Sequence, residues 1–285
     1  MNNFKPQLIS NLTISEVGQT TITALYNANP DISKQKLKQA MQYGAVWLTR
    51  SGKTNRIRRA KKILDIGDEL HLYFNEQTLF AEIVPAKLIA DEIEYSVWDK
   101  PCGMFSQGTK WGDHTSISRW VELYGLEQNN IPQRPCFLVH RLDRATSGLI
   151  IVAHSKKVAS QLAALFETRQ IEKHYTAVVS GHYMAEPERQ EFEADIDGKS
   201  AKSIILSAEY DEDKDQTSLL VKIESGRKHQ IRKHLSGVGY PIIGDRLYGE
   251  KDIDDKPLPD LLLRSCFIEF VCPVCAELRS YSVPQ

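Results

Sequence analysis

The spacing of apolar positions predicts alternating helices and strands along most of the chain. In the segment DISKQKLKQAMQYGAVWL, Leu37 and Met41 lie four residues apart on one helical face. Ser33 suits the N-cap of this helix and Gly44 its end, and a short strand follows. The run GLIIVAH, from Gly148, is continuously apolar, which is typical of a strand buried on both faces.

The same patterns continue toward the C-terminus. SKKVASQLAALFETRQ predicts a helix with its apolar positions at i, i+4, i+7 and i+8, and RKHQIRKHLSGVG predicts another that begins near Lys228. KHYTAVVSG, TSLLVKIESG and LLLRSCFIEFVC predict strands. The order favours an α+β protein with a small domain in residues 1–75, a connector in 76–92 and a larger domain in 93–285.

Composition narrows the class of protein. The chain has 285 residues, of which 41% are hydrophobic and 26% charged, as in globular proteins with a sizeable core. No apolar run approaches the roughly 20 residues needed to cross a bilayer, and the first residues lack a secretory signal pattern. We therefore expect a cytosolic protein that does not contact membranes, with a monomer as the default state.

Charge is distributed unevenly along the chain. The formal net charge is −1, yet residues 34–62 hold ten Lys and Arg and no Asp or Glu. Such a local basic block is the electrostatic footprint of a surface that binds a polyanion, although a solvated helix face is the alternative. The candidate contact residues in this block are Lys34, Lys38, Arg50, Lys53, Arg56, Arg58 and Arg59.

The cysteines favour no disulfide framework, because five occur in a long chain expected in the cytosol. Cys272 and Cys275 have metal-ligand spacing in CPVC, but a structural zinc site needs two further Cys or His, and no second CxxC is present. Incidental thiols are therefore favoured over a metal site.

The stretch HRLDR carries the most unusual chemistry. It places Asp143 between Arg141 and Arg144, directly before a Thr-Ser-Gly turn and the buried strand. A carboxylate held at a core edge and kept ionised by an arginine can serve as nucleophile, base or electrostatic stabiliser. The HRD motif of kinases does not fit, because Leu142 interrupts it and no Gly-rich loop or DFG is present.

A second basic cluster lies in SGRKHQIRKHL. Arg227, His229 and Arg232 suit phosphate contacts and a carboxylate partner, while Ile231 and Leu235 lie four residues apart and face inward. Tyr175, in KHYTAVV, is either a core residue of a strand or a side chain that stacks on a base.

Four motifs together resemble the RluA family of pseudouridine synthases. HRLDRATSGLIIVA is similar to that family's HRLDxxTSGLLL, KHYTAVV to KxYxAxV, and SGRKHQIRKHLSGVGYPIIGDRLYG to its TGRTHQIR segment. WDKPCGM resembles the NKPxG strand. Residues 1–75 resemble an S4 RNA-binding domain more weakly, through ISKQKLKQAMQYGAVWL, SGK and LDIGDEL.

The resemblance implies an S4-like domain followed by a catalytic domain with a central mixed, mainly antiparallel sheet flanked by helices. It implies that Asp143 is the catalytic aspartate, that Arg232 pairs with it and that Tyr175 stacks on the target uracil. The residues expected at the substrate are Arg141, His140, Arg227, His229, Ile231 and Leu235. Lys228 stands where the family has Thr, and adds a charge.

The implied reaction converts uridine in RNA to pseudouridine, which requires no cofactor and no metal. Ribosomal RNA of the large subunit is favoured as the substrate, and transfer RNA stays open. Three other hypotheses remain: a non-catalytic RNA-binding factor with the same fold, a hydrolase that pairs Asp143 with a second carboxylate, and a zinc-dependent module built on Cys272 and Cys275. The residues do not indicate which uridine is modified, or whether Asp143 attacks the sugar or the ring.

Overall fold

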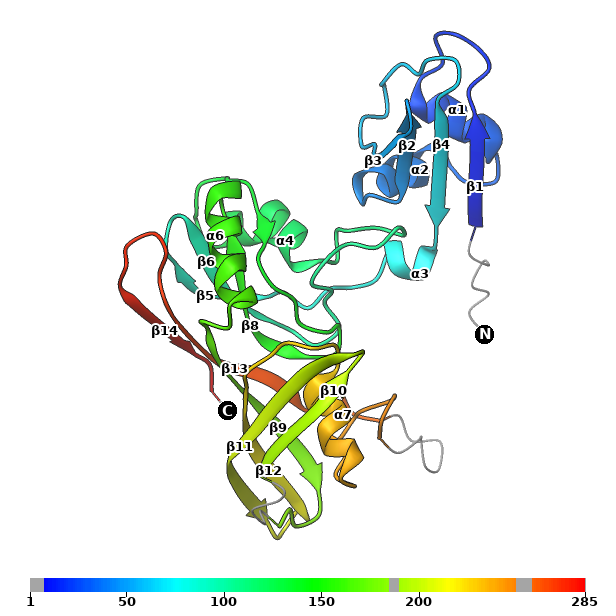
Figure 1. The fold of residues 1–285 in the computed structure, drawn as a ribbon. Helices are drawn as coiled ribbons and strands as arrows, with labels where there is room; N and C mark the ends of the chain where they lie inside the picture. Colours follow the sequence, from blue (N-terminus) through cyan, green and yellow to red (C-terminus); the bar gives the residue numbers. More distant parts are fainter. Residues whose placement is uncertain (1–7, 185–189, 250–257, 285) are drawn as a thin grey trace. The chain divides into compact units, whose positions relative to one another are not determined.

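The computed structural model describes residues 8–184, 190–249 and 258–284, and these form two compact units (Figure 1). The first comprises Met1–Ile83 with Gln107–Trp120, and the second Val84–Ser106 with Val121–Gln285. The chain thus enters the second unit, returns to the first for fourteen residues, and enters the second again. Each unit has a hydrophobic core of its own.

The first unit is a four-stranded sheet in the order β1-β4-β2-β3, all antiparallel, packed on helices α1 and α2. Its elements are β1 (Leu8–Thr13), α1 (Thr21–Ala28), α2 (Lys34–Gln42), β2 (Val46–Arg50), β3 (Lys53–Arg56), β4 (Glu69–Phe74), α3 (Glu76–Leu79) and α4 (Ile117–Trp120). The predicted helix after Ser33 is present, and Ser33 accepts a hydrogen bond from Lys36 N. Helix α1, capped by Thr20, was not predicted.

Residues 107–120 pack on the first unit, although the sequence assigned them to the larger domain. Asp113 lies 2.5 Å from Arg58 and 3.5 Å from Arg56, and its backbone N–H donates to Tyr43 O. The ring of His114 stacks on Tyr43, with centroids 4.0 Å apart. The sequence QGTKWGDHTSISRW has few apolar positions, so polar contacts of this kind leave no periodic signal.

The second unit is built on a mixed, mainly antiparallel sheet, as the resemblance implied. In the described residues the strands follow the order β10-β11-β12-β9-β13-β8-β6-β5, with β14 beside β13 and β7 beside β8. The strands are β5 (Lys87–Asp91), β6 (Tyr95–Lys100), β7 (Phe137–Leu138), β8 (Ser147–Ala153), β9 (Glu172–Ser180), β10 (Glu191–Ile196), β11 (Lys199–Asp211), β12 (Gln216–Ile223), β13 (Leu263–Val271) and β14 (Leu278–Ser282). Its helical segments are a π-helical turn (Val121–Gly125), α5 (Leu126–Gln128), α6 (Lys156–Glu167) and α7 (Gln230–Gly237).

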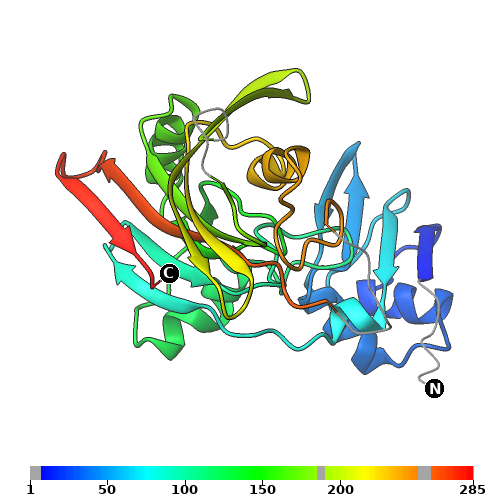
Figure 2. The same cartoon turned by 90° about the horizontal axis from the view of Figure 1, so that it is seen from below.

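Helices lie against this sheet at separate places, with α6 over β8 and α7 beside β10 and β11 (Figures 1 and 2). The predicted connector, 76–92, contains β5, which pairs with β6 and so belongs to the sheet. The sequence analysis missed β5 because it is a five-residue edge strand whose residues are exposed or half-buried, so its apolar positions are few.

A close crossing of β8 and β13 positions the loop that carries Asp143. These two strands pair in parallel at Ser147 and Gly148, and a side chain at Gly148 would place its Cβ 2.2 Å from Ser265 O. Gly148 also has φ +105°, a conformation that favours glycine. Ser265 pairs on its other side with Tyr175 of β9, so the strand that follows the Asp143 loop and the strand that carries Tyr175 flank the same strand, β13.

No helix among the described residues is both long enough and apolar enough to span a membrane.

Candidate active site

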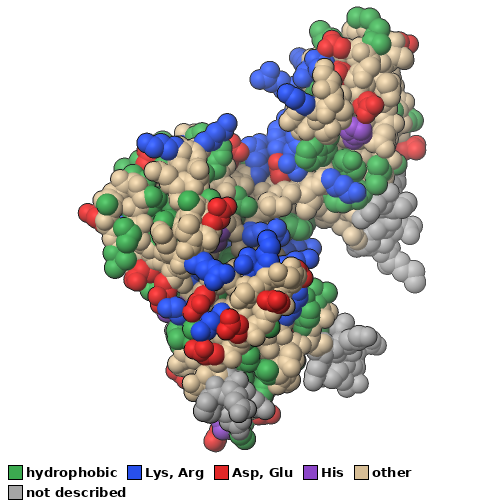
Figure 3. All heavy atoms as spheres, viewed as in Figure 1, with side chains coloured by type: hydrophobic (Ala, Val, Ile, Leu, Met, Phe, Trp, Pro, Cys, Tyr) green, Lys and Arg blue, Asp and Glu red, His purple; other side chains and the backbone are tan. Residues whose placement is uncertain are grey.

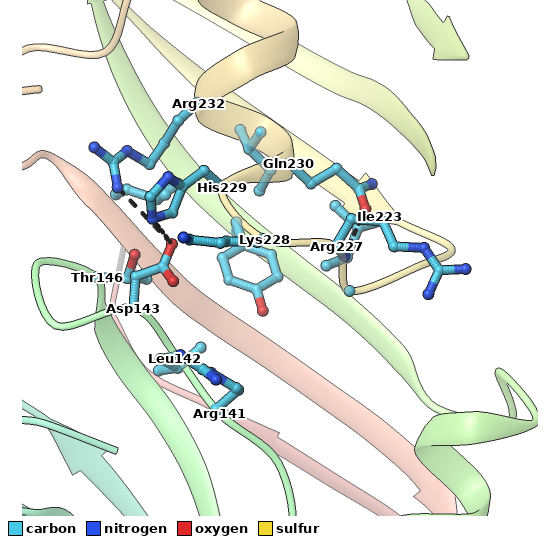
Figure 4. Close-up of a pocket in the computed structure, with 14 residues that line it drawn as sticks. Arg141, Leu142, Asp143, Thr146, Ile223, Arg227, Lys228, His229, Gln230 and Arg232 are labelled. Atoms are coloured by element: carbon cyan, nitrogen blue, oxygen red, sulfur yellow. Dashed lines mark hydrogen bonds and ion pairs between the residues drawn. The ribbon is translucent and has the colours of Figure 1, made fainter. Parts of the chain in front are cut away.

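A pocket of about 310 Å³ lies in the second unit where the loop before β8, strand β9 and the start of α7 converge (Figure 4). It is lined by Arg141, Leu142, Asp143, Thr146, Tyr175, Ile223, Gly226, Arg227, Lys228, His229, Gln230, Ile231, Arg232 and Leu263. Its volume is at the lower end of the range for small-molecule sites. Four sequence segments far apart in the chain, the fourth being β13 with Leu263, therefore contribute to one cavity.

Asp143 is the one carboxylate among the described lining residues. Its side chain is 22% exposed, and its Oδ2 lies 3.7 Å from His229 Nε2 and 3.9 Å from Arg232 Nη1. Both distances exceed that of a hydrogen bond, so Asp143 keeps acceptor capacity for another group. Figure 4 shows Lys228 extended across the pocket toward Asp143, so this carboxylate faces three basic side chains.

Arg232 lies beside Asp143, as the resemblance implies, but a second carboxylate, Asp245, holds it more closely. Its Nε donates to Asp245 Oδ2 and its Nη2 to Asp245 Oδ1, and each hydrogen bond is 2.7 Å long. Both side chains are almost fully buried. Burial alone would lower the pKa of Arg232, but the hydrogen bonds and charge of Asp245 raise it above the usual value. Arg232 is therefore a fixed cation whose third nitrogen, Nη1, points at Asp143.

Asp245 has no oxygen free for chemistry of its own. Besides its two bonds from Arg232, Oδ1 accepts from the backbone N–H groups of Leu247 and Tyr248. Burial would raise the pKa of Asp245, but these donors lower it below the usual value, so the carboxylate is ionised at neutral pH. The ring of Tyr248 lies 5.1 Å from the guanidinium carbon of Arg232 and closes the other side of that side chain.

His229 orients a second nitrogen toward Asp143. Its Nδ1 is 2.9 Å from Tyr248 Oη, and burial lowers its pKa, so its ring is neutral at neutral pH. The backbone of His229 has φ +57°, a left-handed conformation directly before α7. This helix begins at Gln230 rather than near Lys228, because Gln230 Oε1 accepts from the Ser225 hydroxyl and from Arg227 N and so holds the preceding loop outside the helix.

Seven of the predicted site residues line the pocket, and two do not. Those in the lining are Asp143, Tyr175, Arg232, Arg141, Arg227, His229 and Ile231. Leu235, expected to wall the pocket, is 1% exposed and lies in the core one turn further along α7. His140 accepts a hydrogen bond from Ile151 N and stacks on Phe166, outside the lining.

Tyr175 presents a protonated phenol to the pocket. Burial raises its pKa to about 12, so its hydroxyl stays protonated across the neutral range. The other lining side chains from the strands, Ile223 and Leu263, are apolar and buried. An aromatic ring between apolar walls, opposite cationic groups, suits a planar heterocycle attached to an anionic backbone.

In the first unit, the basic block divides into engaged and free side chains. Arg50 is bound by Asp65 and Asp68, Arg56 donates to Gly44 O and Thr109 O, and Arg58 to Gln42 O and Asp113. Lys34 lies over the ring of Tyr26. Lys38, Lys53 and Arg59 are exposed. Three of the seven candidate RNA contacts therefore stabilise the unit itself.

The described residues include no group of three or more His, Cys, Asp or Glu side chains that could hold a metal ion.

Comparison with known proteins decides which family this site belongs to. The family model described as RNA pseudouridylate synthase matches residues 94–237, which is half of the chain and includes Asp143, Tyr175 and Arg232. The chain belongs to the RNA pseudouridylate synthase family. It is therefore an isomerase that converts uridine in RNA to pseudouridine.

The enzyme is similar over most of its length to bacterial relatives of the RluA and RluD type. It is 28% identical over 270 residues to the ribosomal large subunit pseudouridine synthase D of Yersinia pestis, covering 89% of this chain and 80% of that protein. It is 32% identical over 207 residues to the dual-specificity RNA pseudouridine synthase RluA of Vibrio parahaemolyticus, covering 65% and 78%.

A solved structure shares the fold. The human RNA pseudouridylate synthase domain containing 1 superposes with a TM-score of 0.56 at 20% identity, covering 72% of this chain and 85% of that one.

Lys100 is a further residue that sequence reasoning did not single out as functional. Its side chain is fully buried, and its Nζ donates to three carbonyl oxygens, those of Pro101 (3.1 Å), Met104 (2.9 Å) and Arg144 (3.4 Å). Burial lowers the pKa of Lys100 to about 8. The bond to Arg144 O fixes the residue next to Asp143, so Lys100 determines where that loop lies.

We expect Lys100→Met to slow pseudouridine formation by about a hundredfold, because a misplacement of about 1 Å in a reacting group has that effect. RNA affinity should change little, since Lys100 is not in the pocket lining. Single-turnover rates and equilibrium binding measure the two effects separately. An equal loss in both would mean that Lys100 acts on folding and not on the position of Asp143.

Proposed function

We propose that this enzyme isomerises a uridine in structured ribosomal RNA, with Asp143 as its catalytic carboxylate. The observation that carries the proposal is the convergence at Asp143 of the fixed Arg232 guanidinium, the His229 ring and the pocket that Tyr175 lines. An ionised carboxylate with accessible oxygens, opposite basic side chains in a partly dry cleft, is equipped to attack the substrate and to leave it again.

The reaction is balanced without any added reagent. The N1–C1′ bond of uridine breaks, the uracil turns within the pocket, and a C5–C1′ bond forms. The proton leaves C5, N1 gains one, and Asp143 is regenerated. The target must leave the base stack for its ring and sugar to be reached. Asp143 attacks either C1′ or the ring, and Tyr175 is placed to stack on the base throughout.

A hydrolase requires a second carboxylate to activate water. Asp245, which binds Arg232, lies outside the lining, and both of its oxygens are occupied by Arg232 and backbone N–H groups. This arrangement favours isomerisation over base release.

Ribosomal RNA is favoured as the substrate by the name of the Yersinia pestis relative, which acts on the ribosomal large subunit. Transfer RNA is the alternative. Purified enzyme is incubated separately with unmodified ribosomal RNA and with unmodified transfer RNA, and pseudouridine is mapped at single-nucleotide resolution. We expect one or a few sites in ribosomal RNA. Modification of transfer RNA alone would replace the substrate assignment and leave the reaction unchanged.

The first unit is proposed to be an S4-like domain that holds RNA through its free basic side chains. Arg59 and Lys61 are exposed and line an open hollow formed by residues 56–62. Figure 3 shows Lys and Arg side chains gathered on this unit. Because Arg56 and Arg58 are engaged within the unit, the contacts to phosphate fall to these outer residues.

Replacing Arg59 and Lys61 together by Gln should weaken RNA binding and reduce its salt dependence. Each lost phosphate contact lowers the slope of log K against log salt by about 0.7 to 0.9, so a decrease of roughly 1.5 is expected. The control replaces Lys156 and Lys157, which are exposed on α6, by Gln. Slopes are measured by fluorescence anisotropy, and equal slopes for the wild type and the Arg59/Lys61 variant would mean that these two side chains do not contact the RNA.

A further inference from the structure

A buried lysine near the pocket has no partner that accounts for its charge. Lys173 is 6% exposed, and in the part of the chain that the structure describes its Nζ makes no hydrogen bond or ion pair. Its one described interaction is with the ring of Phe166, whose centroid is 5.7 Å away. The Lys173 side chain is buried along its length, but its Nζ is not among the described buried atoms that lack a partner, so the ammonium reaches the surface and can bind an anion from outside the chain.

The surroundings of Lys173 are rich in N–H donors. His140 stacks on the same Phe166 ring, with centroids 4.2 Å apart. Its Nε2 accepts from Ile151 N, so the proton of the neutral ring is on Nδ1, which has no described acceptor. Burial, with the charge of Lys173, lowers the pKa of His140 to about 3, which keeps the ring neutral.

Arg169 supplies a second positive charge. It is exposed just beyond α6, and its guanidinium has no described hydrogen bond or ion pair. Burial, followed by the charge of Arg169, lowers the pKa of Lys173 to about 8, and no described carboxylate is close enough to oppose this. Two cations and a ring N–H around Phe166 thus lack a counter-charge.

This cluster lies within one nucleotide of the pocket. Lys173 and Tyr175 are two residues apart on β9, so they face the same side of the sheet about 7 Å apart along the strand. The pairing of His174 with Lys222 places Lys173 opposite Ile223, which lines the pocket. A strand whose uracil lies against Tyr175 therefore has its neighbouring backbone within reach of Lys173.

We propose that Lys173, with Arg169 and His140 around the ring of Phe166, binds a backbone phosphate of the RNA adjacent to the target uridine. This proposal rests on the proposed function, because it assumes that Tyr175 receives the base. The phosphate supplies the anion that Lys173 lacks, and the Lys173 stem stays packed in the core whether or not RNA is bound.

The test compares Lys173→Met with Lys157→Met. Lys157 is exposed at the start of α6, whereas Phe166 lies near the end of that helix. RNA that the wild type converts is titrated with each full-length protein over a range of salt concentrations. Lys173→Met should weaken binding at least about tenfold, the scale of a hydrogen bond to a charged group, and lower the salt slope by about 0.7. Lys157→Met should change neither.

Thermal unfolding distinguishes a binding role from a structural one. Removing an unpaired buried charge should leave the Tm of Lys173→Met equal to or above that of the wild type. A lower Tm with unchanged RNA affinity would mean that the lysine only packs and snorkels, and would overturn the proposal. Lys173→Arg, which keeps the charge, should retain most of the salt slope.

Neutral methylphosphonate linkages identify the phosphate directly. The linkages are placed one at a time beside the target uridine. One of them should weaken RNA binding by the wild type about tenfold and leave binding by Lys173→Met unchanged, because the substitution and the neutral linkage remove the same contact. If each methylphosphonate weakened binding equally in both proteins, the phosphate site would be refuted. The proposed function would still stand in that case, provided that the wild type formed pseudouridine. Absence of pseudouridine in the wild type would instead contradict the proposed function.

Discussion

Asp143→Asn should abolish pseudouridine formation while leaving the fold and RNA binding intact. The rate should fall by roughly a thousandfold or more, the scale for removing a group that acts directly on the reacting atoms. Asn is nearly isosteric with Asp but cannot supply the negative charge or the nucleophilic oxygen. Single-turnover kinetics with saturating enzyme measure the chemical step without interference from product release.

The stability of this variant is its internal control. Asp143 is 22% exposed, and its distances to His229 and Arg232 exceed that of a hydrogen bond, so the free energy of unfolding should change by less than about 1 kcal/mol. RNA affinity should stay within a few-fold of the wild type. If the purified variant still formed pseudouridine at the wild-type rate, Asp143 would not be the catalytic carboxylate.

Asp245→Asn should have the largest effect on stability. It leaves the Arg232 guanidinium buried with half of its bidentate partner removed, and breaking a buried pair in this way costs about 3–5 kcal/mol. Arg232 would also lose the orientation that points Nη1 at Asp143, so the chemical step should slow as well. Urea unfolding and single-turnover rates measure the two consequences.

The pH dependence of this effect has a defined sign. The pKa of Asp245 is lowered in the folded state, so its stabilisation is present above the unfolded-state pKa of about 3.9 and is lost as pH falls through the lower folded-state value. The stability difference between wild type and Asp245→Asn should therefore narrow in acid.

Asp197→Asn is the control variant. Asp197 pairs with Lys233 and its side chain is 69% exposed, so its replacement should change the free energy of unfolding by less than about 0.5 kcal/mol. A similar loss in both variants would contradict a special role for the buried pair.

The residues that meet in the pocket were largely predictable from local sequence motifs and their resemblance to a family. Asp143, Tyr175 and Arg232 stand in three motifs separated by tens of residues, and the structure brings all three to one pocket. The continuous apolar run after Gly148 predicted the buried strand that fixes the loop before it. These signals were visible because each is encoded within a short stretch of chain.

The partners of these residues were not readable in the same way. The resemblance paired Arg232 with Asp143, which lies 3.9 Å away, but it did not indicate the closer bidentate pair with Asp245, because that pair depends on three-dimensional geometry that no periodic pattern records. Leu235 shares a helical face with Ile231, yet only the first turn of α7 reaches the pocket. Helical spacing identifies a face, and not what each turn of that face contacts.

The break between the two units falls within the predicted connector, but the return of residues 107–120 to the first unit was not predicted, for a related reason. Residues 107–120 join the first unit through Asp113 and through the stacking of His114, which are polar and aromatic contacts over a long sequence separation. Strand β5 is paired by backbone hydrogen bonds at a sheet edge, so its side chains carry little apolar pattern. Both are tertiary interactions that override what local propensity indicates.

Tritium release from RNA labelled at C5 of uridine tests the central claim most directly, because forming the C5–C1′ bond must expel that hydrogen. Purified wild-type enzyme should release tritium in proportion to pseudouridine formed, with no free uracil, and Asp143→Asn should release none above background. Release of free uracil by the wild type would identify a hydrolase. Equal tritium release by the two proteins would contradict the assignment of Asp143.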